Sequence, residues 1–191
     1  MKIRITFTHL LLFAFTVWLI PFLLRLFWIE IPEMNSIQIK QLPNAINDPM
    51  QKLARLILEG NKKEAFILIV TNNLKGCIYN VAGGVSLGIV TLINLCYNGF
   101  FSANIIMAHY KSGMSISNIL KLTLPHSFEF LGFWLSGGIG LYIAWEIINV
   151  IRGKVDFPFI IYKKIGFYLV ITIIITLLAA YVEAFITSTL L

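Results

Sequence analysis

Ionisable side chains lie inside or at the ends of long apolar stretches of the sequence, among them Arg25, Lys75, His126, Glu129 and Glu183. A charged group inside a lipid bilayer is costly, so such groups usually pair with one another or line a path for ions or protons. His126 and Glu129 are three residues apart, which places both on one face of a helix. These residues could therefore bind a metal ion, couple transport to an ion or simply form ion pairs.

Metal ligation would need more ligands than His126 and Glu129 supply. His109 lies on a different predicted element, and the two cysteines of the chain are not spaced as metal ligands. We therefore expect no metal and no cofactor. The simpler interpretation is a helix that begins near Pro125, with Glu129 bonded to His126 or placed favourably near the helix N-terminus.

Motifs of soluble-type enzymes are missing from the sequence. It contains no G-x-S-x-G, no His-Glu-x-x-His and no Walker-type phosphate loop. The aspartates, Asp48 and Asp156, fall in predicted loops, so a membrane protease with paired aspartates is not expected either. We predict that the protein is not an enzyme, and that ATP for any energy-driven work is hydrolysed by another chain.

The composition is that of an integral membrane protein. Of the 191 residues, 58% are hydrophobic and only 13% are charged, and the mean hydropathy is +0.84. A soluble domain carries about 25% charged residues. The net charge of +6 comes from basic residues that stand mainly at the ends of apolar runs, where they suit membrane lipid headgroups rather than nucleic acid.

The apolar runs predict a single membrane domain, residues 1–191, with an all-α fold. A helix needs about 20 residues to cross the hydrocarbon core, and every span must be helical because a lone strand would leave its backbone unpaired in lipid. Five spans are expected, at about 5–29, 74–97, 98–112, 125–151 and 164–190. The segment 98–112 is short enough that a re-entrant segment is an alternative. The first run exceeds a signal-peptide core in length and is expected to stay uncleaved.

The polar connection 30–64 is the long break between apolar runs. Asp48-Pro49 resembles a helix start, and apolar residues then recur at helical spacing. We predict a short amphipathic helix at about 48–60 that lies at the membrane interface.

The orientation follows from the basic residues. Lys2 and Arg4, and the loop with Arg152, Lys154, Lys163 and Lys164, favour a cytoplasmic N-terminus in a bacterial cell membrane. The connection 30–64 carries five basic and five acidic residues and weakens this assignment. In the favoured orientation the five ionisable residues named first would form a polar cluster toward the outer leaflet, with Arg25 near Glu183.

Two stripes of small residues predict close helix packing. Their members are Gly76, Gly84 and Gly88 in one predicted span, and Gly132, Ser136 and Gly140 in another. Small residues at four-residue spacing let helix backbones approach closely. The two spans should pack against each other or against a second copy, and the second case predicts a homodimer.

The middle third of the chain resembles the stage II sporulation protein M family of bacterial membrane proteins. The matching pattern has Asn72-Asn73 opening a span, Asn98-Gly99 ending it, then Leu124-Pro125-His126, Glu129 and the glycine-rich segment 137–140. Ser127 replaces the family's usual glycine, and Glu129 comes one residue early relative to His126. Any role that needs the family's His–Glu geometry is therefore in doubt.

The resemblance implies a non-enzymatic membrane subunit in one of two settings. The favoured one is the transmembrane partner of a separate cytoplasmic ABC-type ATPase in peptide export or immunity, for which the basic loop near Arg152 is a candidate docking site. The alternative is a scaffold for cell-wall hydrolases that remodel peptidoglycan in sporulation engulfment. A third possibility, an ion-coupled transporter or channel, rests only on the buried acids.

Overall fold

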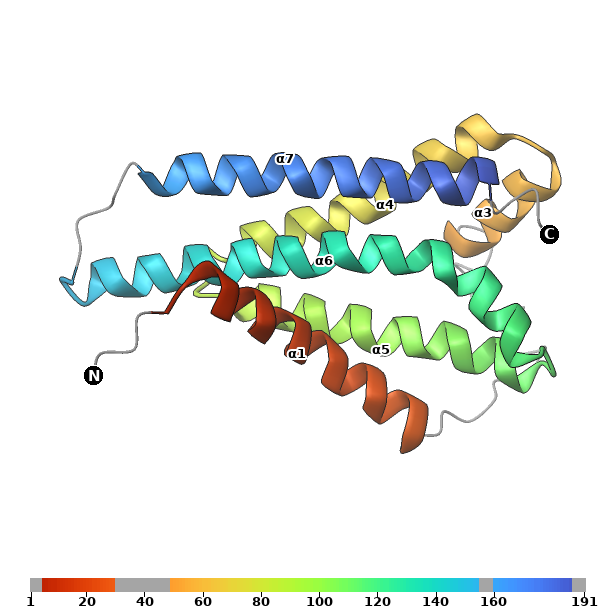
Figure 1. Cartoon of the computed structure of the whole chain (residues 1–191), viewed down its shortest axis with the longest axis horizontal. Coiled ribbons are helices and arrows are strands. Elements are labelled where there is room, and N and C mark those ends of the chain that lie inside the picture. Colours follow the sequence, from red (N-terminus) through yellow and green to blue (C-terminus); the bar gives the residue numbers. More distant parts are fainter. Residues whose placement is uncertain (1–4, 30–48, 155–159, 187–191) are drawn as a thin grey trace, which may run out of the picture.

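The computed structural model describes residues 5–29, 49–154 and 160–186, and the regular elements within these ranges are helical (Figure 1). In chain order they are α1 (Phe7–Phe27), α3 (Pro49–Leu58), α4 (Lys62–Ala82), α5 (Ile89–Lys111), α6 (Ile116–Ile151), α7 (Ile160–Tyr181) and the π-helical turn η2 (Val182–Ile186). Five helices in the described ranges are long and apolar enough to cross a membrane. The predicted all-α fold with five spans is confirmed.

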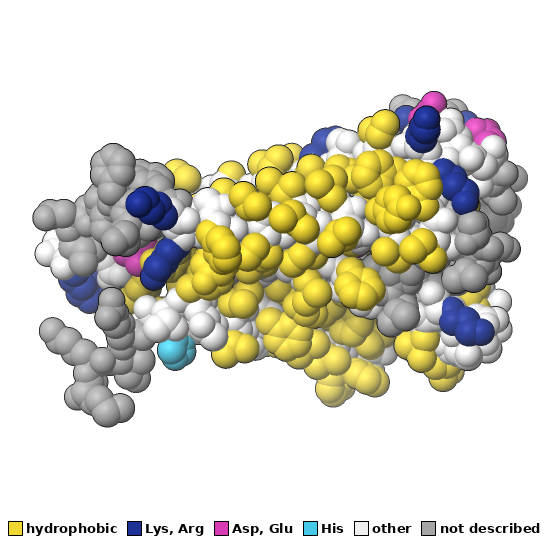
Figure 2. Space-filling model, turned by 45° about the horizontal axis from the view of Figure 1, so that its top comes forward, with side chains coloured by type: hydrophobic (Ala, Val, Ile, Leu, Met, Phe, Trp, Pro, Cys, Tyr) yellow, Lys and Arg dark blue, Asp and Glu magenta, His cyan; other side chains and the backbone are white. Residues whose placement is uncertain are grey.

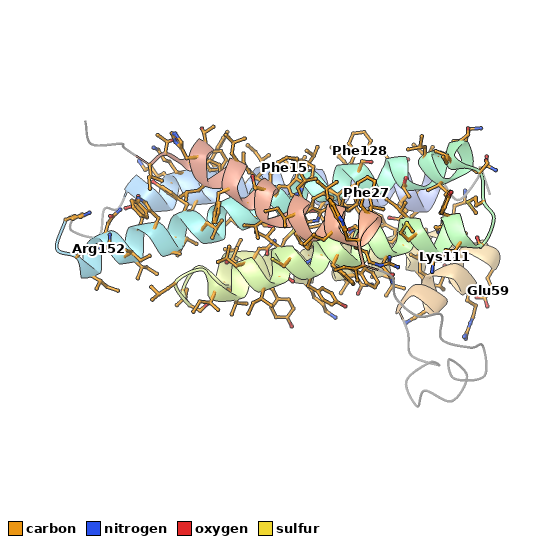
Figure 3. The ribbon with its side chains drawn as sticks, turned by 90° about the horizontal axis from the view of Figure 1, so that it is seen from below. Phe15, Phe27, Glu59, Lys111, Phe128 and Arg152 are labelled. Atoms are coloured by element: carbon orange, nitrogen blue, oxygen red, sulfur yellow. The ribbon has the colours of Figure 1, made fainter. Side chains whose placement is uncertain are left out.

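The spanning helices lie side by side, so the molecule has two distinct ends. Figure 3 shows Arg152 at one end, and Glu59 and Lys111 at the other. We call the first the Arg152 end; it holds the start of α1, the 83–88 turn and the end of α6. The opposite, α3 end holds α3 and the 112–115 turn. Between them Figure 2 shows a broad hydrophobic belt, with Lys and Arg mainly toward the ends.

Helix α6 is the centre of the bundle. It packs against α1, α4, α5 and α7. Half of the residues in its most apolar membrane-spanning stretch are buried, compared with 17% to 22% in the other four spans. The remaining spans turn most of their apolar surface outward, which is what a lipid environment requires.

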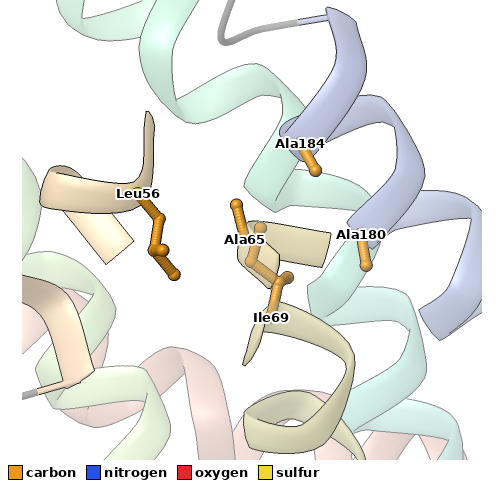
Figure 4. Packing of buried hydrophobic residues seen from close by; sticks show 5 residues of the cluster. All are labelled: Leu56, Ala65, Ile69, Ala180 and Ala184. Carbon is orange, nitrogen blue, oxygen red and sulfur yellow. The ribbon is translucent and has the colours of Figure 1, made fainter. Parts of the chain in front are cut away.

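Helix α3 closes one end of the bundle, where the sequence predicted an amphipathic helix at about 48–60. It begins at Pro49, and Asp48 lies outside the described residues. Leu56 of α3 belongs to a buried hydrophobic cluster (Figure 4). The other members are Ala65 and Ile69 of α4, Ala180 of α7 and Ala184 of η2.

The predicted spans 74–97 and 98–112 are wrong, because the chain turns at residues 83–88. Gly88, with φ of +85°, is the N-cap of α5 in a left-handed conformation that glycine adopts without strain. The exposed apolar side chains Val85 and Leu87 make this turn look like part of a span. Asn98 and Gly99 therefore lie within α5 and do not end a helix. Helix α5 is long and apolar enough to cross a membrane, which favours a full span over the re-entrant alternative.

Helix α6 begins earlier than the sequence suggested. The span was predicted to start at about residue 125, but the chain is helical from Ile116, where the side chain of Ser115 accepts a hydrogen bond from Asn118 N at 3.3 Å. Pro125 lies inside this helix and not at its start. Proline lacks an N–H and disturbs the preceding turn, and Figure 1 shows α6 bending in this region.

Candidate functional site

The most deeply buried polar side chain of α4 is Asn80, at 0% exposure. Its amide nitrogen donates to Phe133 O at 3.1 Å and to Ser136 Oγ at 3.0 Å, both on α6. Its amide oxygen accepts from Asn94 Nδ2 of α5 at 2.8 Å. A single side chain therefore joins three spans.

The polar contacts of Asn80 continue along α5. Asn94 Nδ2 also donates to Gly76 O at 3.0 Å, and Asn98 Nδ2 donates to Asn94 O at 2.7 Å. Thr91 Oγ1 donates to the backbone oxygen of Asn80 at 2.7 Å. Interhelical hydrogen bonds of this kind hold membrane helices together. We call Asn80, Asn94, Asn98, Thr91 and Ser136 the amide network.

Glu129 is attached to α4 by a second polar contact. Asn73 Nδ2 donates to Glu129 Oε1 at 2.5 Å. Asn73 lies near the middle of α4 and does not open a span, contrary to the prediction for Asn72-Asn73. The contact therefore places the Glu129 carboxyl at the level of the middle of α4.

Arg25 is buried, with 4% exposure, near the end of α1. Its Nε and Nη2 donate to Asn104 Oδ1 of α5 at 3.1 and 2.8 Å, and its Nη1 donates to Ile29 O at 2.8 Å. Both ends of the guanidinium are thus occupied by neutral oxygens. The predicted pairing of Arg25 with Glu183 is wrong.

Of the five ionisable residues singled out in the sequence, the four whose side chains are described do not form one cluster. Glu183 is buried on η2, which packs against α4, α6 and α7, whereas Arg25 lies on α1. Lys75 is exposed on the outer face of α4. The side chain of His126 lies outside the described residues. Their common depth was estimated from wrong helix boundaries, and the helix faces were not known.

Three small residues of the two predicted stripes, Gly76, Gly84 and Gly140, lie where α4 and the turn after it meet α6. A Cβ on Gly84 would collide with the backbone of Gly140 and approach Ile143 Cβ to 2.8 Å. A Cβ on Gly140 would in turn collide with the backbone of Asn80, and one on Gly76 with the ring of Phe133. These stripes are therefore occupied by contacts within the chain, and they leave no small-residue face that argues for the predicted homodimer.

The other predicted small residues take different contacts. Gly132 faces Thr176 of α7, where an added Cβ would lie 3.0 Å from Oγ1, and Gly88 caps α5. Gly99, named only as part of the family pattern, lies against the backbone of Trp18, so it lets α1 approach α5.

Within the described residues no group of three His, Cys, Asp or Glu side chains could hold a metal ion. The central groups of the arrangement are amides and hydroxyls, which are suited to fixing helices relative to one another. Sequence analysis missed Asn104, Thr91 and Asn94 as partners. Their polarity within an apolar run was the available signal, and the missing information was the turn at 83–88.

Comparison with known proteins gives two matches. The sequence model of a family described as "Stage II sporulation protein M" matches residues 5–188. An uncharacterized protein of Methanocaldococcus jannaschii is 32% identical over 126 residues, which cover 64% of this chain and 70% of that relative. No solved structure matches the chain.

Proposed function

Because the chain belongs to the stage II sporulation protein M family, we propose that it is a non-enzymatic membrane subunit and the transmembrane partner of a separate ABC-type ATPase. A subunit of this kind must span the membrane, hold its helices together and offer a surface to a protein outside the lipid. The five-span bundle and its amide network suit the first two requirements.

The observation that carries the proposal is the basic surface of the Arg152 end. Arg152 and Lys154 follow α6, and Lys163 and Lys164 lie in the first turns of α7. All four side chains are exposed. Concentrated positive charge on the cytoplasmic side attracts an acidic protein surface and speeds its docking. With the N-terminus cytoplasmic, this end would meet a soluble ATPase.

Peptide export or immunity is the cargo class that we favour, and it rests on the family resemblance. An ion-coupled transporter or channel has less support. Glu129 accepts from Asn73, and the amides next to it bond to one another and to backbone carbonyls. Groups engaged in this way support helix packing better than they support passage of an ion.

A pull-down from native membranes tests the ATPase proposal. The tagged protein is purified in mild detergent, and its partners are identified by mass spectrometry. We expect an ATPase to copurify with the wild type and to be lost from the double variant Arg152→Glu/Lys154→Glu. The matched control Lys52→Glu/Arg55→Glu reverses two exposed charges on α3 and should retain it. An absence of any ATPase from the wild type contradicts the proposal.

A scaffold for cell-wall hydrolases is the second candidate, and the α3 end favours it. Helix α3 packs its apolar side on α4 and leaves Lys52 and Arg55 exposed. In the favoured orientation these side chains face outward, toward the cell wall. A wall hydrolase in the same pull-down, lost on Lys52→Glu/Arg55→Glu and retained on Arg152→Glu/Lys154→Glu, would select this function instead.

A further inference from the structure

An apolar groove runs between α4 and α7 on the outside of the bundle. Its volume is about 370 Å³, and the lining side chains include Cys77, Ile78 and Val81 of α4 with Leu169, Thr172 and Ile173 of α7. Ile78 and Ile173 are 62% and 44% exposed, so the groove opens to the surroundings of the spans. On another face of α4, Gly76 lies against Phe133 of α6, and Gly84, in the turn that follows α4, lies against Gly140 of α6.

A lysine stands at the edge of this groove. Lys75 is exposed and lies three residues before Ile78, so both are on the same side of α4. Thr71 and Tyr79, four residues to either side of Lys75, are exposed as well. Among the described residues, Lys75 has no hydrogen bond or ion pair.

The position of Lys75 makes it hard for the ammonium group to reach water. At a rise of about 1.5 Å per residue, Lys75 lies roughly 10 Å from the end of α4 at Ala82 and roughly 20 Å from its start at Lys62. Side chains on a helix lean toward its N-terminus, and here that direction is the longer one. Extension of the side chain to the nearer interface works against its natural direction, so a charge-bearing partner inside the membrane is favoured.

A second copy of the chain is a poor partner for this face. Two copies related by an axis along the membrane normal meet at equal depth, which brings Lys75 toward Lys75. The acids on the described spans do not compensate: Glu183 is buried, Glu129 accepts from Asn73, and Glu146 lies near the far end of α6. A lipid tail fills a groove but has no acceptor for an ammonium group.

We propose that the α4–α7 groove receives a membrane-spanning helix of a different protein, and that an Asp or Glu on this helix pairs with Lys75. Charge complementarity selects the partner, and the groove supplies the apolar contact. The proposal is independent of the ATPase, which would dock outside the lipid at the Arg152 end.

Site-specific photo-cross-linking in native membranes tests this proposal. A benzophenone amino acid is placed at Ile78 in the groove or, as a control, at Leu12, which is 61% exposed on α1. We expect a protein adduct from position 78 and none from position 12. The cross-linked peptide should come from a membrane-spanning segment that contains Asp or Glu.

Substitutions of Lys75 supply the second measurement. Lys75→Met should lower the yield of the adduct about tenfold or more, because the partner carboxyl then lacks its cation. Lys75→Arg and the control Lys63→Met, at an exposed position on the first turn of α4, should leave it near the wild-type yield. Lys75→Glu combined with an acid-to-lysine change in the partner should restore it. Equal thermal melting of the variants in detergent checks that they fold.

Several results would overturn the proposal. An adduct with twice the mass of the chain identifies a second copy, and adducts with lipid alone identify a lipid site. A protein adduct whose yield is unchanged by Lys75→Met would contradict the proposed ion pair. An adduct whose cross-linked segment contains no Asp or Glu would contradict it as well. None of these results bears on the ATPase pull-down, so the two proposals fail separately.

Discussion

Asn80 shows how a membrane protein can use an amide where a soluble protein would use a hydrophobic core. Its side chain has partners on α5 and α6, and every one of them is uncharged. A neutral amide costs less free energy to bury than an ion does. Its hydrogen bonds are directional, so they fix the helices relative to one another in a way that dispersion forces do not.

We expect Asn80→Ala to lower the free energy of unfolding by about 1–3 kcal/mol, since Phe133 O, Ser136 Oγ and Asn94 Nδ2 each lose a partner in the buried interior. Unfolding in mixed micelles with rising dodecyl sulfate measures this change. Asn118→Ala, at an exposed position in the first turn of α6, is the control and should change little. Equal stability of the two variants would show that the network does not hold the helices.

The contact between Arg25 and Asn104 should be measurable as a coupling energy. A double-mutant cycle with Arg25→Ala and Asn104→Ala is expected to give about 1 kcal/mol or more, because the guanidinium donates twice to one amide oxygen. Lys in place of Arg25 should recover only part of it, since an ammonium cannot present the same planar fork. Additive effects of the two alanine substitutions would contradict the contact.

Individual polar contacts were the least predictable feature of this sequence. Asn80 and Asn94 were both assigned to one predicted span, in which fourteen residues would separate them by about 21 Å. The turn between α4 and α5 instead brings their side chains to 2.8 Å. This contact depends on a chain reversal that hydropathy does not detect.

At the scale of elements, glycine decides how closely helices approach. Gly140→Ala should destabilise the protein by about 1–3 kcal/mol or more, because the new methyl would collide with the backbone of Asn80 and lie 2.7 Å from Thr91 Oγ1. Gly166→Ala is the matched control on α7, where an added Cβ meets nothing within 4 Å, and should be neutral or slightly stabilising. The melting temperatures of the two variants in detergent provide the comparison.

The same residue type explains why the element boundaries were mispredicted. Gly76, Gly84 and Gly88 are separated by eight and by four residues, and were interpreted as one helix face. Gly76 is in a helix, Gly84 lies in the turn against α6, and Gly88 has a positive φ that ends the turn. Spacing cannot distinguish these three uses of glycine, because each of them requires a residue that has no side chain.

At the scale of the whole molecule, the number of spans was predictable because hydropathy is summed over about 20 residues. Errors of several residues at each boundary do not change that sum. Which end of the bundle faces the cytoplasm is harder to predict, because basic residues lie at both ends. Arg152 and Lys154 lie at one end, and Lys52 and Arg55 lie at the other.

Cysteine labelling should decide the orientation. In a background that lacks Cys77 and Cys96, we expect Glu59→Cys to react with a membrane-impermeant maleimide in intact cells. Lys154→Cys should react only after permeabilisation. Both positions are exposed. Figure 3 shows Glu59 at one end of the bundle and Arg152, two residues before Lys154, at the other. The reverse pattern would place the Arg152 end outside and remove the basis for docking an ATPase there.

The length of α6 has a mechanical consequence. Its 36 residues extend over about 54 Å, well beyond the roughly 30 Å of a hydrocarbon core, and the excess lies at the α3 end. This helix contacts every other span. Its first turns, before the bend near Pro125, form a short arm that precedes the stretch Ser127–Ile151, the part long and apolar enough to cross a membrane. A force on this arm would reach the whole bundle at once, whereas the tight 83–88 turn offers no such handle at the opposite face.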